Sequence, residues 1–268
     1  MSARVDPQMK RGAVFPQGLD PVQLQELLSL VDRRQPIGAR IERATRPLLG
    51  RPSLVHPLVG SAETPEVFTV SLDGFDCVTY IETVFALALA RTREGFLAAL
   101  RRIRYQDGRV GWARRHHYMT AWIRANARAG ILGRVSFPAA SVVRARTLAV
   151  VPGLPARRVL LRCWPKRAFW RVRDAVRTGD VICFASTRSN LDVFHAGIAV
   201  WSGGELRLRH AARSQGRVVE QALADFLRAN TMAGVIVARP VEPRQRAAAR
   251  IHGRSGGRKR RRQVESRS

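Results

Sequence analysis

The spacing of apolar residues predicts helices in the first half of the chain. Apolar residues recur every three or four positions after Asp20-Pro21, a pair suited to cap a helix and begin it. A second helix is expected from Ile37 to about Arg46, and others over residues 96–103 and 118–125. A short alternating run over residues 67–72 predicts the end of a strand.

Residues 77–90, which begin with Cys77, are apolar on nearly every face of the predicted helix. The run is shorter than the roughly 20 residues that cross a bilayer, and no longer apolar run occurs, so no transmembrane segment is expected. A helix that is hydrophobic all round is buried in a core. We therefore expect a central buried helix that carries Cys77 in its first turn.

Short apolar runs separated by turn residues predict strands in the second half of the chain. These runs cover residues 142–151, 159–161, 181–184, 193–201, 206–208 and 235–237, and residues 222–228 predict one small helix. Helices followed by strands are typical of an α+β domain with an antiparallel sheet. We expect one such domain over residues 19–242, with a helical insertion at about 94–130, after an irregular N-terminus of residues 1–18.

The chain is strongly basic. It carries 47 Lys and Arg residues against 20 Asp and Glu, which makes the net charge +27, and only three of the basic residues are lysine. Residues 243–268 lose the apolar pattern and are expected to form a disordered, Arg-rich tail. A bias toward arginine can reflect genome composition alone, but the charge favours contact with polyanions such as nucleic acid, anionic lipid or acidic envelope polymers.

Cys77 is the most informative candidate for chemistry. It follows Asp76 and a glycine-containing turn, at the expected start of the buried helix. The unpaired backbone N–H groups and the positive end of the helix dipole favour a thiolate there, and the same N–H groups could hold an oxyanion. Cys163 and Cys183 are interpreted as buried packing residues.

His195 and His210 are the candidate partners of Cys77. His195 opens a predicted strand and His210 ends the next one, with Ser202-Gly203-Gly204 between them as a hairpin turn. If the strands pair, both imidazoles reach the same end of the hairpin, where one could act as a base and contact the other. The plain alternative is that each histidine satisfies a local backbone group. The paired Cys or His spacing of zinc sites is missing, so no metal is expected.

Six short motifs occur in one order along residues 20–240. They are Phe75–Glu82, Ile103–Gly108, Arg115–Tyr118 with Trp122, Gly179–Ile182, Leu191–Ala199 and His210–Ala212. In this order they resemble the bacterial N-acetylmuramoyl-L-alanine amidase-like family of the NlpC-type papain-like cysteine hydrolases.

The resemblance implies a papain-like fold and a cell-wall amidase that cuts the bond between N-acetylmuramic acid and L-alanine in peptidoglycan or muropeptides, without a metal or organic cofactor. It makes Cys77 the nucleophile, His195 the base and His210 the orienting polar group. Helix packing and surface salt bridges are an equally open interpretation of the residues that it suggests for substrate binding. These are Asp76, Arg104, Tyr105, Asp107, Arg115, His117 and Tyr118.

The chain departs from the family pattern in two respects. Ser53 stands where the family usually has a tyrosine of the substrate cleft, and no signal peptide is visible in residues 1–18 although the family is usually exported. Two alternatives to the amidase stay open. One is an endopeptidase of the same fold that cuts within the stem peptide, and the other is a basic nucleic-acid-binding protein without enzymatic activity.

Overall fold

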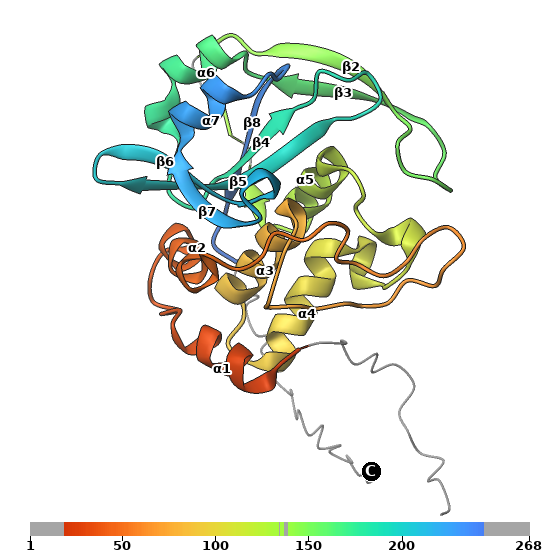
Figure 1. Cartoon of the computed structure of the whole chain (residues 1–268), viewed down its shortest axis with the longest axis vertical. Coiled ribbons are helices and arrows are strands. Elements are labelled where there is room, and N and C mark those ends of the chain that lie inside the picture. Colours follow the sequence, from red (N-terminus) through yellow and green to blue (C-terminus); the bar gives the residue numbers. More distant parts are fainter. Residues whose placement is uncertain (1–18, 134, 137–138, 244–268) are drawn as a thin grey trace, which may run out of the picture.

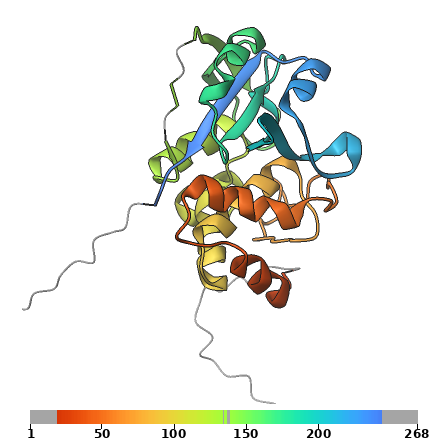
Figure 2. The ribbon, with the colours of Figure 1, turned by 90° about the vertical axis from the view of Figure 1, so that its left-hand side faces the viewer.

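The computed structural model describes residues 19–243, apart from residues 134, 137 and 138. The predictions for the N-terminus and the Arg-rich tail lie outside the described residues, except at Pro243. The helices of the first half of the chain gather on one side of the molecule, and the strands lie on the other side with two short helices among them, as two views at right angles show (Figures 1 and 2).

Helices dominate the chain up to residue 128. They are α1 (Pro21–Ser29), α2 (Ile37–Thr45), α3 (Cys77–Leu89), α4 (Arg93–Arg104) and α5 (Met119–Arg128), with the 3-10 turns η1 (Arg46–Leu48), η2 (Gln106–Gly108) and η3 (Trp112–Arg114). Helix α1 begins where the sequence predicts, because the Asp20 carboxylate accepts a hydrogen bond from the Val22 N–H at 2.8 Å and Pro21 occupies the first turn.

The strands form one antiparallel sheet and a separate hairpin. The sheet has the order β1-β8-β4-β5-β6-β7, and β2 and β3 pair with each other in a two-stranded sheet. The elements are β1 (Leu132–Gly133), β2 (Val142–Leu148), β3 (Arg157–Cys163), α6 (Lys166–Arg171), η4 (Arg173–Ala175), β4 (Val181–Ala185), β5 (Val193–Ser202), β6 (Glu205–Ala212), η5 (Arg213–Gln215), β7 (Arg217–Ala222), α7 (Leu223–Ala229) and β8 (Gly234–Pro240).

Helix α3 lies at the centre of the main hydrophobic core. Its apolar residues pack with Ile41 of α2, Leu100 of α4 and Ile198 of β5 in one cluster, so it is enclosed by helices and by the sheet. A second cluster lies on the other side of the sheet and includes Phe226 of α7 and Phe169 of α6. Among the described residues, no helix has the length and apolar character to cross a membrane.

The mixed α+β architecture with an antiparallel sheet is confirmed, but one local prediction is wrong and one strand, β7, was not expected. Residues 67–72 are not a strand. The side chains of Phe68, Val70 and Leu72 alternate into the core, but no strand of the described residues pairs with this backbone. Strand β7 was not predicted, since it holds only two adjacent apolar residues, Val218 and Val219. Alternating burial therefore does not require a hydrogen-bonded partner, and pairing with β6 makes β7 a strand.

Candidate active site

Cys77 is the first residue of α3, and Asp76 caps this helix. The Asp76 carboxylate accepts hydrogen bonds from the backbone N–H groups of Val78 at 3.0 Å and Thr79 at 2.7 Å. The Thr79 hydroxyl accepts a hydrogen bond from the Asp76 N–H at 3.0 Å, which completes a capping box. Interactions among neighbouring residues therefore set where α3 begins and place the half-buried Cys77 in its first turn.

The expected thiolate is a prediction that the structure corrects. Burial raises the pKa of the Cys77 thiol to about 12, and the charge of Asp76 raises it as well. The N–H groups of Ala196, Cys77 and Val78 lower this pKa, but by less. The thiol is therefore protonated at neutral pH, because desolvation and a neighbouring carboxylate outweigh the helix start.

His195 and His210 form a hydrogen-bonded pair. Their strands β5 and β6 are antiparallel neighbours, and His195 Nε2 lies 2.7 Å from His210 Nδ1. The His195 ring is nearly parallel to Phe226 of α7 at 5.5 Å and to Phe184 of β4 at 6.3 Å. The aromatic rings thus hold the orientation of an imidazole that strand pairing has brought to its partner.

Both imidazoles are neutral at physiological pH. Burial lowers the pKa of His195 to about 3, and the neighbouring His210 lowers it further. Burial also lowers the pKa of His210 to about 4. A neutral imidazole is the form that can accept a proton from a thiol.

The start of α3 meets β5 at the residue that follows His195. The N–H of Ala196, the residue after His195, acts on the Cys77 thiol, and Ala196 is paired with Cys183 of β4. Within the described part of the chain, no hydrogen bond joins Cys77 to His195. Catalytic hydrogen bonds are often long in a free enzyme and shorten when substrate binds.

Ser53 lies beside the segment that leads into Cys77. It forms an isolated parallel β-bridge with Phe75, and its N–H donates a hydrogen bond to the Gly216 carbonyl at 2.8 Å. The departure from the family pattern therefore stands next to the candidate nucleophile, where a serine leaves more room than a tyrosine.

Two of the candidate substrate-binding residues bind other parts of the protein from buried positions. Arg104 is 2% exposed, with its Nε 2.7 Å from a Glu82 carboxylate oxygen and Nη1 2.7 Å from the Thr69 carbonyl. Tyr105 is fully buried, and its hydroxyl donates to Glu66 at 2.8 Å. These bonds hold the extended segment 66–69 against α4, and contact with substrate by either residue stays a prediction.

The other candidates in this region shape its loops. Arg115 forms an ion pair with Glu66 at 3.2 Å and lies over the Trp112 ring, and His117 Nε2 contacts the Trp112 carbonyl at 2.7 Å. The Tyr118 hydroxyl accepts the N–H groups of Val150 and Val151, at 3.1 and 3.3 Å. Asp107 has a φ of 55° in the turn after α4.

Sequence reasoning did not single out Glu66 or Phe226. Glu66 joins Tyr105 to Arg115, and Phe226 faces both histidines. Nothing in the loop around Glu66 signals this role. Phe226 lies in a predicted helix, but only the packing of α7 on β5 and β6 shows which rings it meets.

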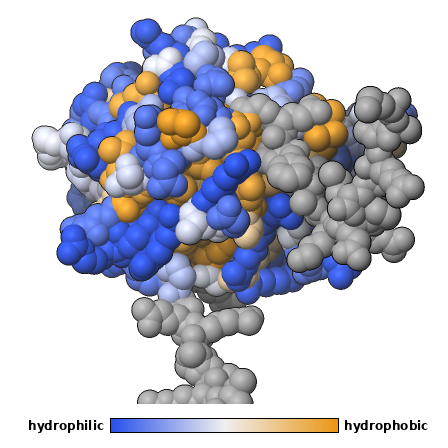
Figure 3. Space-filling view, turned by 90° about the horizontal axis from the view of Figure 1, so that it is seen from below, coloured by the Kyte–Doolittle hydropathy of each residue, from blue (hydrophilic) through white to orange (hydrophobic). Residues whose placement is uncertain are grey.

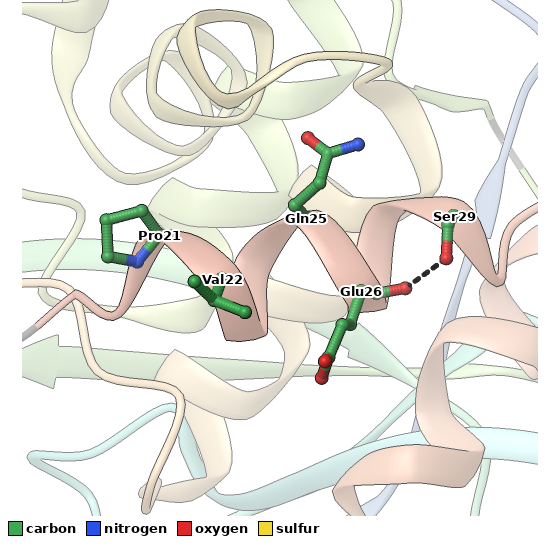
Figure 4. Close-up of a pocket in the computed structure, with 5 residues that line it drawn as sticks. All are labelled: Pro21, Val22, Gln25, Glu26 and Ser29. Carbon is green, nitrogen blue, oxygen red and sulfur yellow. Dashed lines mark hydrogen bonds between the residues drawn. The ribbon is translucent and has the colours of Figure 1, made fainter.

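A surface hollow on α1 does not coincide with the candidate site. It measures about 400 Å³ and is lined by Pro21, Val22, Gln25, Glu26 and Ser29, all of α1. Their side chains point to different sides of the helix (Figure 4). On the face seen from below, hydrophobic residues are scattered among hydrophilic ones (Figure 3). In residues 19–243 as described, no cluster of three or more His, Cys, Asp or Glu is arranged to hold a metal ion.

Comparison with known families identifies the chain. A family model described as N-acetylmuramoyl-L-alanine amidase-like matches residues 43–235, a span that includes Cys77, His195 and His210. The chain belongs to the N-acetylmuramoyl-L-alanine amidase-like family. A search of curated proteins finds no significant match to this family member.

Solved structures share the fold of this amidase-like protein. A Legionella pneumophila protein is 20% identical with a TM-score of 0.74, over 83% of this chain and 94% of its own. An N-acetylmuramoyl-L-alanine amidase of Bacteroides uniformis is 24% identical with a TM-score of 0.65, over 82% and 100%. A Bacteroides fragilis protein proposed to be a xylanase is 26% identical with a TM-score of 0.61, over 73% and 98%. One fold thus carries different proposed activities, so the reaction must be argued from the site.

Proposed function

We propose that the chain is a cysteine-dependent N-acetylmuramoyl-L-alanine amidase with an NlpC-type papain-like fold. The observation that carries the proposal is the His195–His210 pair on β5 and β6, together with a cysteine at the start of α3 that the N–H of the residue after His195 contacts. A thiol with two imidazoles suits acyl transfer, whereas glycoside hydrolysis generally requires a pair of carboxyl groups. The family supports an amide as the bond that is cut.

The proton positions follow from the geometry. The Nε2 atom of His195 is hydrogen-bonded to His210. The other ring nitrogen of His195, Nδ1, is therefore the one that can accept a proton from Cys77. His195 then donates its Nε2–H to His210 Nδ1, and the proton of His210 sits on Nε2, a buried atom without a hydrogen-bond partner among the described residues. His210 thereby sets the tautomer of His195 and stabilises the imidazolium that forms.

The reaction begins with a neutral thiol and a neutral imidazole. The Cys77 sulfur attacks the lactyl carbonyl carbon while its proton passes to His195, and the N–H groups at the start of α3 stabilise the oxyanion. The imidazolium protonates the alanine nitrogen, and the C–N bond breaks to release the peptide. His195 then takes a proton from water, whose oxygen attacks the thioester carbonyl carbon. The C–S bond breaks, His195 returns the proton to the Cys77 sulfur, and the product acid leaves as a carboxylate.

Digestion of purified muropeptides tests the proposal. Mass spectrometry should find N-acetylmuramic acid with a free carboxylate and a peptide that begins with L-alanine. Cys77→Ala should lower kcat by about 10³-fold or more while the fold survives, and Cys163→Ala should stay within a few-fold of wild type. A sugar that keeps L-alanine and D-glutamate would establish the endopeptidase instead, and turnover by folded Cys77→Ala would refute the mechanism.

A further inference from the structure

The middle of the chain is basic without compensating acids. No Asp or Glu occurs in residues 108–173, although this stretch holds fifteen basic residues. An arginine-rich genome adds arginine throughout a protein, but it does not remove carboxylates from one segment. The stretch includes β2 and β3, which lie at the edge of the molecule opposite α1 (Figure 1).

The hairpin β2–β3, here called the basic hairpin, has one face open to solvent. The register places Val143 opposite Arg162, Ala145 opposite Leu160, and Thr147 opposite Arg158 on this face. All six residues are exposed, Leu160 by 68% and Val143 by 47%. The outer face therefore combines an apolar centre with two arginines.

The charge of the basic hairpin is not neutralised from within the protein. Among the described residues, its arginines form no ion pair. Elsewhere, arginines such as Arg104, Arg209 and Arg239 bind carboxylates. Unpaired guanidinium groups beside apolar surface can receive carboxylates through paired, charge-assisted hydrogen bonds.

The basic hairpin is attached to the candidate active site. Arg146 Nη2 donates to the Ser186 carbonyl at 2.8 Å, and the Thr147 N–H donates to the Ser189 carbonyl at 3.0 Å. The bound loop connects β4 to β5 and leads directly to His195. The Tyr118 hydroxyl holds the same end of the hairpin, because it accepts the N–H of Val150, two residues beyond the end of β2. The loop that binds the hairpin is therefore continuous with the strand that carries His195.

We propose that the outer face of the basic hairpin binds the acidic stem peptides of intact peptidoglycan that flank the peptide being cut. Carboxylates of the peptides pair with Arg158 and Arg162, and alanine methyl groups cover Val143 and Leu160. This inference rests on the proposed amidase, because attachment of the hairpin to the site is what favours a polymeric form of the same substrate over nucleic acid or lipid.

Co-sedimentation with purified peptidoglycan sacculi tests this surface in the full-length chain. Cys77→Ala serves as the background so that the sacculi are not digested. Adding Arg158→Gln and Arg162→Gln should weaken binding about tenfold at low salt and flatten its dependence on NaCl. The matched control, Arg34→Gln with Arg91→Gln, removes the same charge from exposed positions and should change binding less than twofold.

Three results would overturn the proposal. Binding to sacculi could be unchanged in the hairpin variant, or it could fall equally in the control. The hairpin arginines could instead govern binding to duplex DNA or to vesicles of anionic phospholipid, measured in parallel, and not to sacculi. Muropeptide hydrolysis by the hairpin variant with Cys77 restored is measured separately, so failure of the proposed reaction is distinguished from failure of the docking surface.

Discussion

At Cys77, two properties of one helix start act against each other. The N–H groups of the first turn lower the pKa of the thiol, while burial and the capping carboxylate of Asp76 raise it. Asp76 thus stabilises the helix and opposes the thiolate. Proton transfer to His195 must accompany attack by the sulfur, since neither group is charged beforehand.

Replacing Asp76 separates these two roles. An asparagine retains the carbonyl oxygen that caps α3 but removes the charge. We expect Asp76→Asn to lower the pKa of Cys77 by about one unit, because a nearby negative charge disfavours the thiolate. The rate of iodoacetamide alkylation against pH measures this shift. Asp225→Asn, an exposed site on α7, should leave the profile unchanged; an unchanged profile in Asp76→Asn would contradict the electrostatic argument.

At the level of elements, α7 supplies the ring that orders both histidines. Phe226 stacks on His195 and lies edge to face with His210 at 5.4 Å. The helix therefore controls both the orientation and the hydration of the pair. This contact joins α7 to two strands of the sheet.

Phe226→Leu should raise the pKa values of His195 and His210 toward their ordinary value, because the smaller side chain admits water. We expect kcat to fall about tenfold with little change in KM. Titration of the imidazoles by NMR measures the pKa shift without relying on turnover. Phe169→Leu, in the same core cluster but on α6, is the matched control for lost packing. Identical titrations in both variants would argue against a positioning role.

The pairing of α3 with α4 gives a second prediction at this scale. Arg104 and Glu82 are each 2% exposed and form a buried ion pair. Arg104→Met should lower the free energy of unfolding by about 3–5 kcal/mol, because it leaves a buried carboxylate without its partner. The double variant Arg104→Met with Glu82→Met should recover part of the loss. Urea unfolding measures both, and loss of activity in Arg104→Met at wild-type stability would instead favour contact with substrate.

At the scale of the whole molecule, the buried histidines couple folding to pH. Their folded pKa values, about 3 and 4, lie below the ordinary value near 6.5, so the unfolded chain binds more protons between these limits. Their contribution to stability is therefore complete above pH 6.5 and is lost as the pH falls toward 4.

Thermal unfolding between pH 7.5 and pH 4.5 tests whether stability falls as the pH falls. The wild type should lose Tm as the pH falls, and His210→Leu should lose less because one titrating group is absent. His56→Asn, at an exposed histidine, should follow the wild type. Parallel curves of Tm against pH for wild type and His210→Leu would show that other groups cause the loss of stability at low pH.

Local sequence was sufficient for features that depend on neighbouring residues. The cap at Asp20, the apolar helix of α3 and the turn between β5 and β6 were predicted, because caps, periodicity and turn chemistry act over a few residues. The α+β class follows from their order. The ordered motifs also predicted the family that the comparison shows.

Tertiary structure decided whatever depends on distant parts of the chain. The pKa of Cys77 depends on burial against β5, and the buried partner of Arg104 lies 22 residues away in the sequence. Residues 67–72 show the burial pattern of a strand but pair with no strand in the described part of the chain, while β7 is a strand because β6 lies beside it. Desolvation and strand pairing are set by contacts between distant segments, which no local pattern contains.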